Sequence, residues 1–302
     1  MSPQSETARA VILMTAAMAA FTVNDACMKA VTATLPLYQT IFLRNLVAAA
    51  AIAIIAYRTG GLRLRLPGRD ARYVGLRLVG EVGSTLTFLT ALKHMPLASL
   101  SAIMQSMPLA VVMAAALFLG ERIGWRRLTA IGIGFAGVLL IVRPGTEGFD
   151  RWSVLGLVCV GFVVLRDLST RNISARVSSQ TVAFFAATSV TVAAGLAVPF
   201  TGWESPTGAE ALLIMGAAAF LILGYLTVVG ATRGGDIGTV APFRYTALIF
   251  AILLGFAVFG DLPDAMTLAG SALIVASGLY ALYRSRRLSA RPPADADQPP
   301  PA

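Results

Sequence analysis

Residues 97–119 read LASLSAIMQSMPLAVVMAAALFL, a run that contains no charged side chain. A helix that crosses the hydrocarbon core of a bilayer needs about 20 predominantly apolar residues, so this run is long enough to span a membrane. Similar apolar runs, separated by short polar breaks, make up nearly all of the 302-residue chain. The sequence therefore predicts an all-α integral membrane protein and leaves no room for a soluble domain.

The overall composition agrees with this class. Hydrophobic residues make up 57% of the chain and charged residues 13%, against about a quarter charged in a soluble domain. Apolar periodicity and Gly, Pro and charge punctuation predict ten transmembrane helices. We expect them near residues 9–31, 37–57, 72–92, 97–119, 127–142, 152–170, 181–200, 209–230, 237–259 and 265–283.

The formal net charge of +9 would suit nucleic-acid binding, but the basic residues lie between the apolar runs. No basic patch carries the interleaved aromatic residues that favour nucleic acid. Segments on the side of the amino terminus hold most of the arginines, and segments on the other side hold only Lys93, Arg143 and Arg151. By the positive-inside rule both termini should be cytoplasmic, so we predict a multi-pass protein of a bacterial inner membrane. The predicted cytoplasmic set is Arg9, Arg58, Arg63, Arg65, Arg69, Arg72, Arg122, Arg126, Arg127, Arg171, Arg176, Arg233, Arg284, Arg286, Arg287 and Arg291.

The two halves of the chain match each other at an offset of about 140 residues. Leu86-Thr87 recurs as Leu226-Thr227, and Gly120-Glu121 recurs as Gly260-Asp261. Asp25 with Lys29 likewise recurs as Asp167 with Arg171. Because each copy holds five helices, an odd number, the second copy must enter the membrane upside down. Inverted repeats are typical of secondary transporters, whose substrate sites lie near the midplane between the repeats.

Several motifs carry a family resemblance. Residues 91–99 (ALKHMPLAS), Pro108, residues 120–122 (GER) and the glycines at 132, 134 and 137 resemble the EamA-domain branch of the drug/metabolite transporter superfamily. Pro242, residues 260–261, Gly270 and Gly278 resemble the same domain in a second copy. The resemblance implies two inverted five-helix EamA repeats, at residues 9–143 and 152–284, around a central cavity. Residues 241–246 (APFRYT) look most like a branch that includes riboflavin and S-adenosylmethionine uptake carriers. The tail, 285–302, has a composition with little to bury, and we expect it to be disordered.

Ionisable residues inside the predicted helices are candidates for the substrate site, because such residues normally face a cavity or a partner. Glu81 lies near the midplane and shares a helix face with Arg77 and Ser84. Either it pairs with Arg77 or Arg44, or it contacts substrate or a proton. Arg244 would line the site or extend to the membrane surface. The substrate-binding residues we predict are Phe42, Arg44, Glu81, Phe88, Gln105, Arg244 and Tyr245.

Two pairs with i, i+4 spacing, Asp25 with Lys29 and Asp167 with Arg171, are predicted to form local ion pairs with a structural or gating role. His94 lies at a helix end, where we expect it to be exposed and inert. Pro96, Pro108 and Pro242 can open backbone hydrogen bonds and are predicted hinges.

A transporter explains the repeat, the lack of soluble domains and the buried charges together. One histidine, unpaired cysteines and the lack of a Gly-rich phosphate loop argue against an enzyme, so we expect no catalytic residue, metal or cofactor. The predicted function is alternating-access transport of a small organic metabolite, with riboflavin-like uptake first. The alternatives are export of amino acids or related metabolites, and a non-transporting receptor or scaffold. The protein would act as a monomer or homodimer.

Overall fold

The computed structural model describes residues 3–58, 66, 68–121, 123–145, 150–174, 176–234 and 237–289. Every regular element in these residues is a helix. The elements are α1 (Pro3–Val31), α2 (Leu37–Arg58), α3 (Gly68–His94), α4 (Leu97–Met104), α5 (Met107–Leu119), α6 (Trp125–Val142), α7 (Arg151–Arg171), α8 (Ser179–Thr201), α9 (Gly208–Gly234), α10 (Ile237–Val240), the 3₁₀ helix η1 (Ala241–Tyr245), α11 (Thr246–Phe259) and α12 (Ala265–Ser289).

These elements form ten membrane crossings. In the described residues, nine segments are long and apolar enough to span a bilayer; α4 and α5 together make one of them. The tenth crossing is α3. It is less apolar than the other nine because Arg77 and Glu81 lie in its middle. At 27 residues α3 is long enough to cross, and the crossings before and after it require it to do so. The predicted fold class is confirmed.

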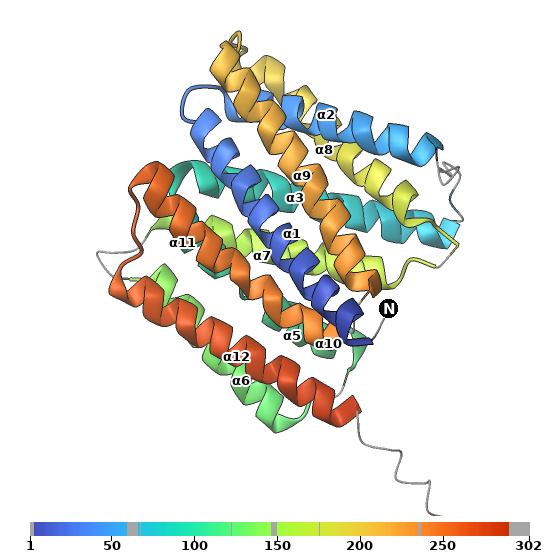
Figure 1. The fold of residues 1–302 in the computed structure, drawn as a ribbon, viewed down its shortest axis with the longest axis vertical. Coiled ribbons are helices and arrows are strands. Elements are labelled where there is room, and N and C mark those ends of the chain that lie inside the picture. Colours follow the sequence, from blue (N-terminus) through green and yellow to red (C-terminus); the bar gives the residue numbers. More distant parts are fainter. Residues whose placement is uncertain are drawn as a thin grey trace, which may run out of the picture.

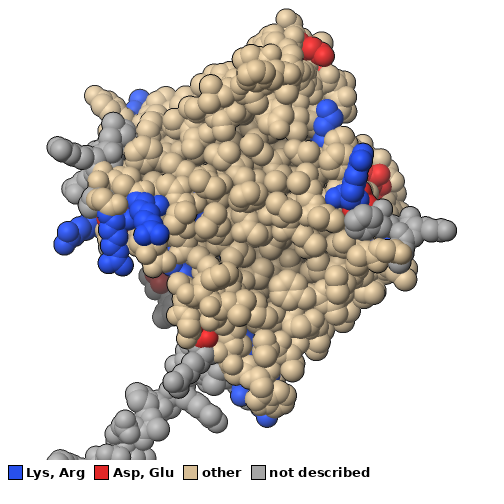
Figure 2. Space-filling view, turned by 180° about the vertical axis from the view of Figure 1, so that it is seen from behind, with Lys and Arg blue, Asp and Glu red and all other residues tan. Residues whose placement is uncertain are grey.

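The start of α1 and the ends of α2, α5, α7, α9 and α12 define one face of the bundle, here called the terminal face. The loops after α1, α3, α6, α8 and α11 define the opposite face. In Figure 1, α2 and α8 form one edge, α6 and α12 form the other, and the remaining helices lie between them. Charged side chains gather near the edges of the molecule in Figure 2, with a broad uncharged band between them. That band suits a lipid-facing surface.

The helix interfaces repeat in the way that an inverted duplication requires. In the repeat, α1 corresponds to α7 and α9 corresponds to α3. The α1–α9 interface therefore corresponds to the α7–α3 interface, and both are extensive. The helices of the α2–α8 pair correspond to each other, as do those of the α6–α12 pair, and these two pairs form the other two large interfaces. The sequence offset and the packing therefore describe the same two-fold relation.

Two crossings break at equivalent positions of the halves. The helix in residues 97–119 is interrupted at Gln105 and Ser106, with Pro108 in the first turn of α5. The crossing that ends at Phe259 contains η1, with Pro242 in its first turn. Proline lacks the amide hydrogen that a continuous helix needs, so both predicted interruptions are present as breaks in the backbone.

The recurring glycines at 120 and 260 end helices α5 and α11. Gly120 has φ of 69° and Gly260 has φ of 71°. This left-handed region disfavours residues with a Cβ atom, and glycine is the usual residue after a helix end. The repeated Gly-acid pair is therefore a helix cap that places Glu121 and Asp261 at corresponding corners of opposite faces.

The main hydrophobic core fills the half of the bundle toward the opposite face. It joins the end of α1 (Met28, Val31) to the end of α3 (Leu92), and includes α4 and the start of α7. In the terminal half the buried core divides into two smaller clusters, one at α1, α9 and α10, the other at α5, α6 and α12. Among the described residues, apolar packing thus seals the bundle near the opposite face and is less extensive near the terminal face.

Several helices extend past the predicted spans on the terminal face, because hydropathy detects only the lipid-facing part of a helix. The largest differences are at α1, which begins at Pro3, and at α12, which continues to Ser289. The expected disordered tail is therefore wrong for residues 285–289, where Arg and Leu favour helix. The rest of that tail, and the predicted loop around Arg65, lie outside the described residues.

Candidate substrate site

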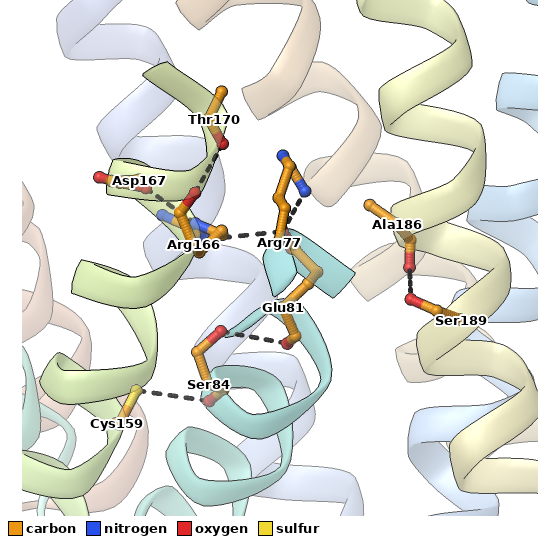
Figure 3. A network of polar contacts seen from close by, with 9 residues as sticks. All are labelled: Arg77, Glu81, Ser84, Cys159, Arg166, Asp167, Thr170, Ala186 and Ser189. Carbon is orange, nitrogen blue, oxygen red and sulfur yellow. Dashed lines mark hydrogen bonds and ion pairs between the residues drawn. The ribbon is translucent and has the colours of Figure 1, made fainter. Parts of the chain in front are cut away.

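A network of charges joins α3 and α7 in the middle of the bundle (Figure 3). Arg77 Nη1 donates to Glu81 Oε2 at 2.9 Å, and Arg166 Nη1 lies 3.9 Å from the same oxygen. Arg166 Nε also donates to Asp167 Oδ1 at 2.9 Å. The Glu81 side chain keeps only 11% of its surface accessible. Glu81 therefore does pair with Arg77, as one interpretation of the sequence expected, while its second partner is Arg166 from the other half of the chain rather than Arg44.

Glycines on α3 allow this contact. A Cβ atom on Gly80 would lie 2.7 Å from the backbone nitrogen of Arg166, closer than real contacts permit. A Cβ atom on Gly83 would meet the ring of Phe162. One turn further along, the thiol of Cys159 donates to the carbonyl of Ser84 at 3.3 Å. The backbones of α3 and α7 are thus in direct contact where Arg166 reaches Glu81.

A second polar cluster lies closer to the opposite face, on α1 and α2. Arg44 Nη1 donates to Asn24 Oδ1 at 3.4 Å, and Asn24 Nδ2 donates to Asp25 Oδ1 at 2.9 Å. Arg44 is 5% exposed, and its Nε has no partner among the described residues. Asp25 is half-buried. Arg44 therefore lies deep in the protein, as predicted, but it belongs to this cluster.

Tyr225 of α9 lies between the two clusters. It is within electrostatic reach of Glu81, Arg166 and Arg44, and its ring packs edge-on against Phe21 with centroids 5.5 Å apart. Nevertheless 45% of its surface is accessible. Tyr225 is therefore accessible while it stays within electrostatic reach of charged groups from both clusters. The offset of the repeat relates Tyr225 to Thr85 on the predicted cavity face of α3, a signal that the sequence analysis did not use.

Arg244 of η1 is exposed. Its charge interacts with those of Asp167 and Arg166, and it forms no salt bridge with a described residue. Arg244 therefore belongs on the terminal-face side of the α3–α7 network, as a cation with no direct counter-ion. Tyr225 and Arg244 are both exposed, and Arg244 lies nearer to the terminal face.

The other predicted substrate residues are packed away from these charges. Phe42 packs on Gly195 of α8, and Phe88 packs against the main core. Gln105 is 7% exposed at the α4–α5 break. Tyr245 is 6% exposed, with its hydroxyl in the space above Gly278 of α12. Gln105 and Tyr245 thus lie in helix breaks that pack against neighbouring helices in this structure, and their part in substrate binding stays a prediction.

The two predicted local ion pairs are also wrong. Lys29 Nζ donates to the carbonyls of Met95 at 2.7 Å and Leu92 at 3.3 Å, near the end of α3 where helix carbonyls lack partners. Arg171 Nη1 instead donates to Glu121 at 3.2 Å. Each long side chain finds a better acceptor on another helix than on its own.

These two residues occupy related places. Lys29 is attracted by Asp261 at the opposite face, and Arg171 binds Glu121 at the terminal face. The inverted repeat therefore brings a basic residue near the end of the first helix of each half toward the carboxylate of a Gly-acid cap, as a salt bridge for Arg171 and as a longer-range attraction for Lys29.

At the opposite face, His94 is exposed, as expected, and its ring stacks on Trp152 with centroids 3.8 Å apart. Among the described residues no three His, Cys, Asp or Glu side chains gather in a group that would hold a metal ion. The polar chemistry of the site is consequently that of guanidinium, carboxylate, amide and phenol groups.

Comparison with known proteins identifies the first half of the chain. The model of the EamA-like transporter family matches residues 8–143. These residues are an EamA domain. With ten membrane crossings and this match, the chain is similar to multi-pass membrane transporters.

Three relatives carry different transport names. The chain is 29% identical to the Pseudopaline exporter CntI of Pseudomonas aeruginosa over 92% of this chain and 96% of the exporter. It is 28% identical to an S-adenosylmethionine uptake transporter of Rickettsia felis, over 65% and 66% of the two chains. It is 27% identical to a riboflavin transporter of Rhizobium johnstonii, over 76% and 75%. These relatives agree on transport and differ in solute and direction.

A solved structure confirms the fold independently. It has a TM-score of 0.65 with 23% sequence identity, and the match covers 96% of this chain and all of the solved chain. At this identity the likeness describes the fold alone.

Proposed function

We propose that this protein is a secondary carrier of a bacterial inner membrane, with both termini in the cytoplasm. Residues 152–284 would be a second, inverted EamA repeat. The single observation that carries the proposal is the accessible polar site built between the two halves, in which Glu81 of α3 binds Arg166 of α7. A site that uses both halves changes when they move relative to each other, as alternating access requires.

The position of the seal supports a direction of access. The main apolar core closes the bundle toward the opposite face, and the described arginines gather mainly at the terminal face. If that face is cytoplasmic, the site in this structure is reached from the cytoplasm. Uptake would release the solute in this state, and export would bind it.

The chemistry of the site favours a charged organic metabolite. Arg44, Arg77, Arg166 and Arg244 are balanced by only three nearby carboxylates, those of Asp25, Glu81 and Asp167. Binding sites combine apolar surface with a few well-placed polar groups, and the Phe21–Tyr225 pair offers an aromatic surface beside the charges. We therefore propose a solute that carries both an aromatic part and ionic groups, taken up or exported.

Riboflavin-like uptake is the second candidate, and the Rhizobium johnstonii relative favours it. Riboflavin offers a flat ring system and hydroxyls but no permanent ionic group. It would use the aromatic pair and the arginine donors, and leave the carboxylates without a role in binding.

Flux measurements decide between these candidates. Purified protein in proteoliposomes should move at least one radiolabelled solute from a panel of amino acids, S-adenosylmethionine and riboflavin. Growth of a riboflavin-auxotrophic strain on low external riboflavin tests the second candidate separately. Failure of every solute in both orientations, with the protein present in the bilayer, would favour the receptor or scaffold alternative and refute the carrier.

A further inference from the structure

The cluster on α1 and α2 has an unusual order of charges. Arg44 and Asp25 attract each other electrostatically but form no salt bridge. The amide of Asn24 lies between them, accepting from Arg44 and donating to Asp25. A guanidinium and a carboxylate are therefore held apart by one neutral side chain in the interior of the bundle.

The second half of the protein provides the comparison. Asp167 is the repeat counterpart of Asp25, and Arg166 is the counterpart of Asn24. In both halves the side chain of the preceding residue donates to the aspartate Oδ1 at 2.9 Å. The donor is a cation before Asp167 and a neutral amide before Asp25. The same local geometry thus neutralises one aspartate and leaves the other without a direct counter-ion.

The other carboxylates in the site are already paired. Glu81 binds Arg77 and Arg166, and Asp167 binds Arg166. Asp25 has only the Asn24 amide, and Arg44, which is 95% buried, keeps an Nε without a partner in the described residues. Buried charges without direct partners are unfavourable, so a ligand that brings an opposite charge to each of them gains an interaction that the free site lacks.

We propose that Asp25 and Arg44 bind the ammonium and the carboxylate of an α-amino-acid group on the transported solute. This inference rests on the proposed carrier function and names its substrate class. An α-amino acid carries its two opposite charges on one carbon, so it can bridge an anion and a cation that one amide keeps apart. Guanidinium and carboxylate groups also match in hydrogen-bond geometry.

The neighbouring residues define where the rest of the solute lies. Phe21 is four residues before Asp25 and therefore on the same face of α1, and it packs against the accessible ring of Tyr225. The solute's side chain would extend along these rings toward the terminal face. The other charge near Asp25 on α1, Lys29, is occupied by the carbonyls of Leu92 and Met95 and does not compete for the ligand.

The test uses matched probes on the full-length protein in nanodiscs. Tryptophan carries both charges, tryptamine lacks the carboxylate, and indole-3-propionate lacks the ammonium. S-adenosylhomocysteine and 5′-methylthioadenosine form a second pair, which differs in the amino-acid end. We expect tryptophan or S-adenosylhomocysteine to bind at least tenfold more tightly than its truncated partners. This comparison needs no variant and so does not depend on the folding of one.

Two variants then assign the charges. Asp25→Asn should weaken tryptophan binding at least tenfold and leave indole-3-propionate unchanged, whereas Arg44→Gln should weaken tryptophan and leave tryptamine unchanged. Gly75→Ala is the control variant, because no atom lies within 4 Å of the added Cβ. It should be expressed and should bind tryptophan as the unmodified protein does.

Equal binding of the truncated probes would overturn the inference, as would unchanged tryptophan affinity in both variants. Transport of riboflavin without binding of any amino-acid probe would refute the inference and uphold the carrier. Absence of flux for every solute would refute the carrier function itself.

Discussion

The substitution Gly80→Ala tests whether direct contact between α3 and α7 holds the central charge network. The new Cβ atom would lie 2.7 Å from the backbone nitrogen of Arg166, 2.8 Å from its Cβ and 2.8 Å from the carbonyl oxygen of Phe162. These are atoms of the α7 backbone and its first side-chain carbon, so no side-chain rotation relieves the overlap. An ordinary contact begins at 3.4 Å. The two helices must therefore separate by several tenths of an ångström.

The expected cost follows from the behaviour of overpacked cores, where an added methyl group destabilises by about 1–3 kcal/mol. Each kcal/mol lowers the melting temperature of a protein of this size class by about 2–4 °C, so we expect a decrease of about 2–12 °C. Separation also lengthens the 3.9 Å approach of Arg166 to Glu81, and flux should fall with stability. Fluorescence-detected melting in detergent and proteoliposome flux measure the two effects.

The same helix supplies a matched control. Gly75 meets no atom within 4 Å, and alanine is the better helix former by about 1 kcal/mol, so Gly75→Ala should leave the melting temperature unchanged or raise it. If Gly80→Ala melts within about 1 °C of Gly75→Ala and transports normally, the close contact between α3 and α7 has no energetic role and the reasoning is wrong.

Three further predictions concern charge and topology. Glu81→Gln should reach the membrane in normal amounts and lose at least about 90% of flux, because Arg77 and Arg166 lose their shared counter-ion; ordinary flux at several pH values would contradict this. Outside the membrane, the backbone N–H of Thr267 and then the side chain of Arg143 lower the pKa of Asp264, so its contribution to stability is present above the usual Asp pKa of about 3.9 and is lost as pH falls through the lowered value. Since Asp264 is largely exposed, the contribution is under about 1 kcal/mol, and Asp264→Asn should reduce the acid sensitivity of the melting temperature between pH 5 and about pH 2; an unchanged pH profile would count against it. Ser289→Cys should react with an impermeant thiol reagent in inverted vesicles but not in intact cells, and labelling of intact cells would place the terminal face outside.

The fold could be predicted from the sequence because a bilayer imposes strong rules on apolar length and charge. Helix α3 is the exception to these rules. The segment in α3 is less apolar than the others because it carries Arg77 and Glu81, and these are the residues that build the site. Functional charge weakens the hydropathy signal of the helix that carries it, so the least apolar crossing was the best candidate for lining the cavity.

The candidate site could be predicted only in part from the sequence, because long Lys and Arg side chains can reach acceptors outside their own helix. Spacing along one helix correctly joined Arg77 to Glu81, whose partner is one turn away. The same rule failed for Lys29 and Arg171, which reach acceptors on other helices. Phe42 and Phe88 pack against the core in this structure, a role that hydrophobicity alone cannot separate from binding, and their part in binding stays a prediction.

The repeat contains more information about function where its two copies differ than where they agree. Agreement explains architecture: Gly120 and Gly260 end corresponding helices, and Lys29 and Arg171 are attracted by the acidic residues that follow these glycines. Both copies need such features, because the two halves of the bundle pack against each other through equivalent interfaces. A solute has no such symmetry, so the groups that bind it must break the relation between the halves. The exchange of Arg166 for Asn24 breaks it at a position where the local hydrogen bond to the aspartate is otherwise the same. The fold does not need the charge that this exchange leaves on Asp25 without a direct counter-ion among the described residues, and a ligand can use it.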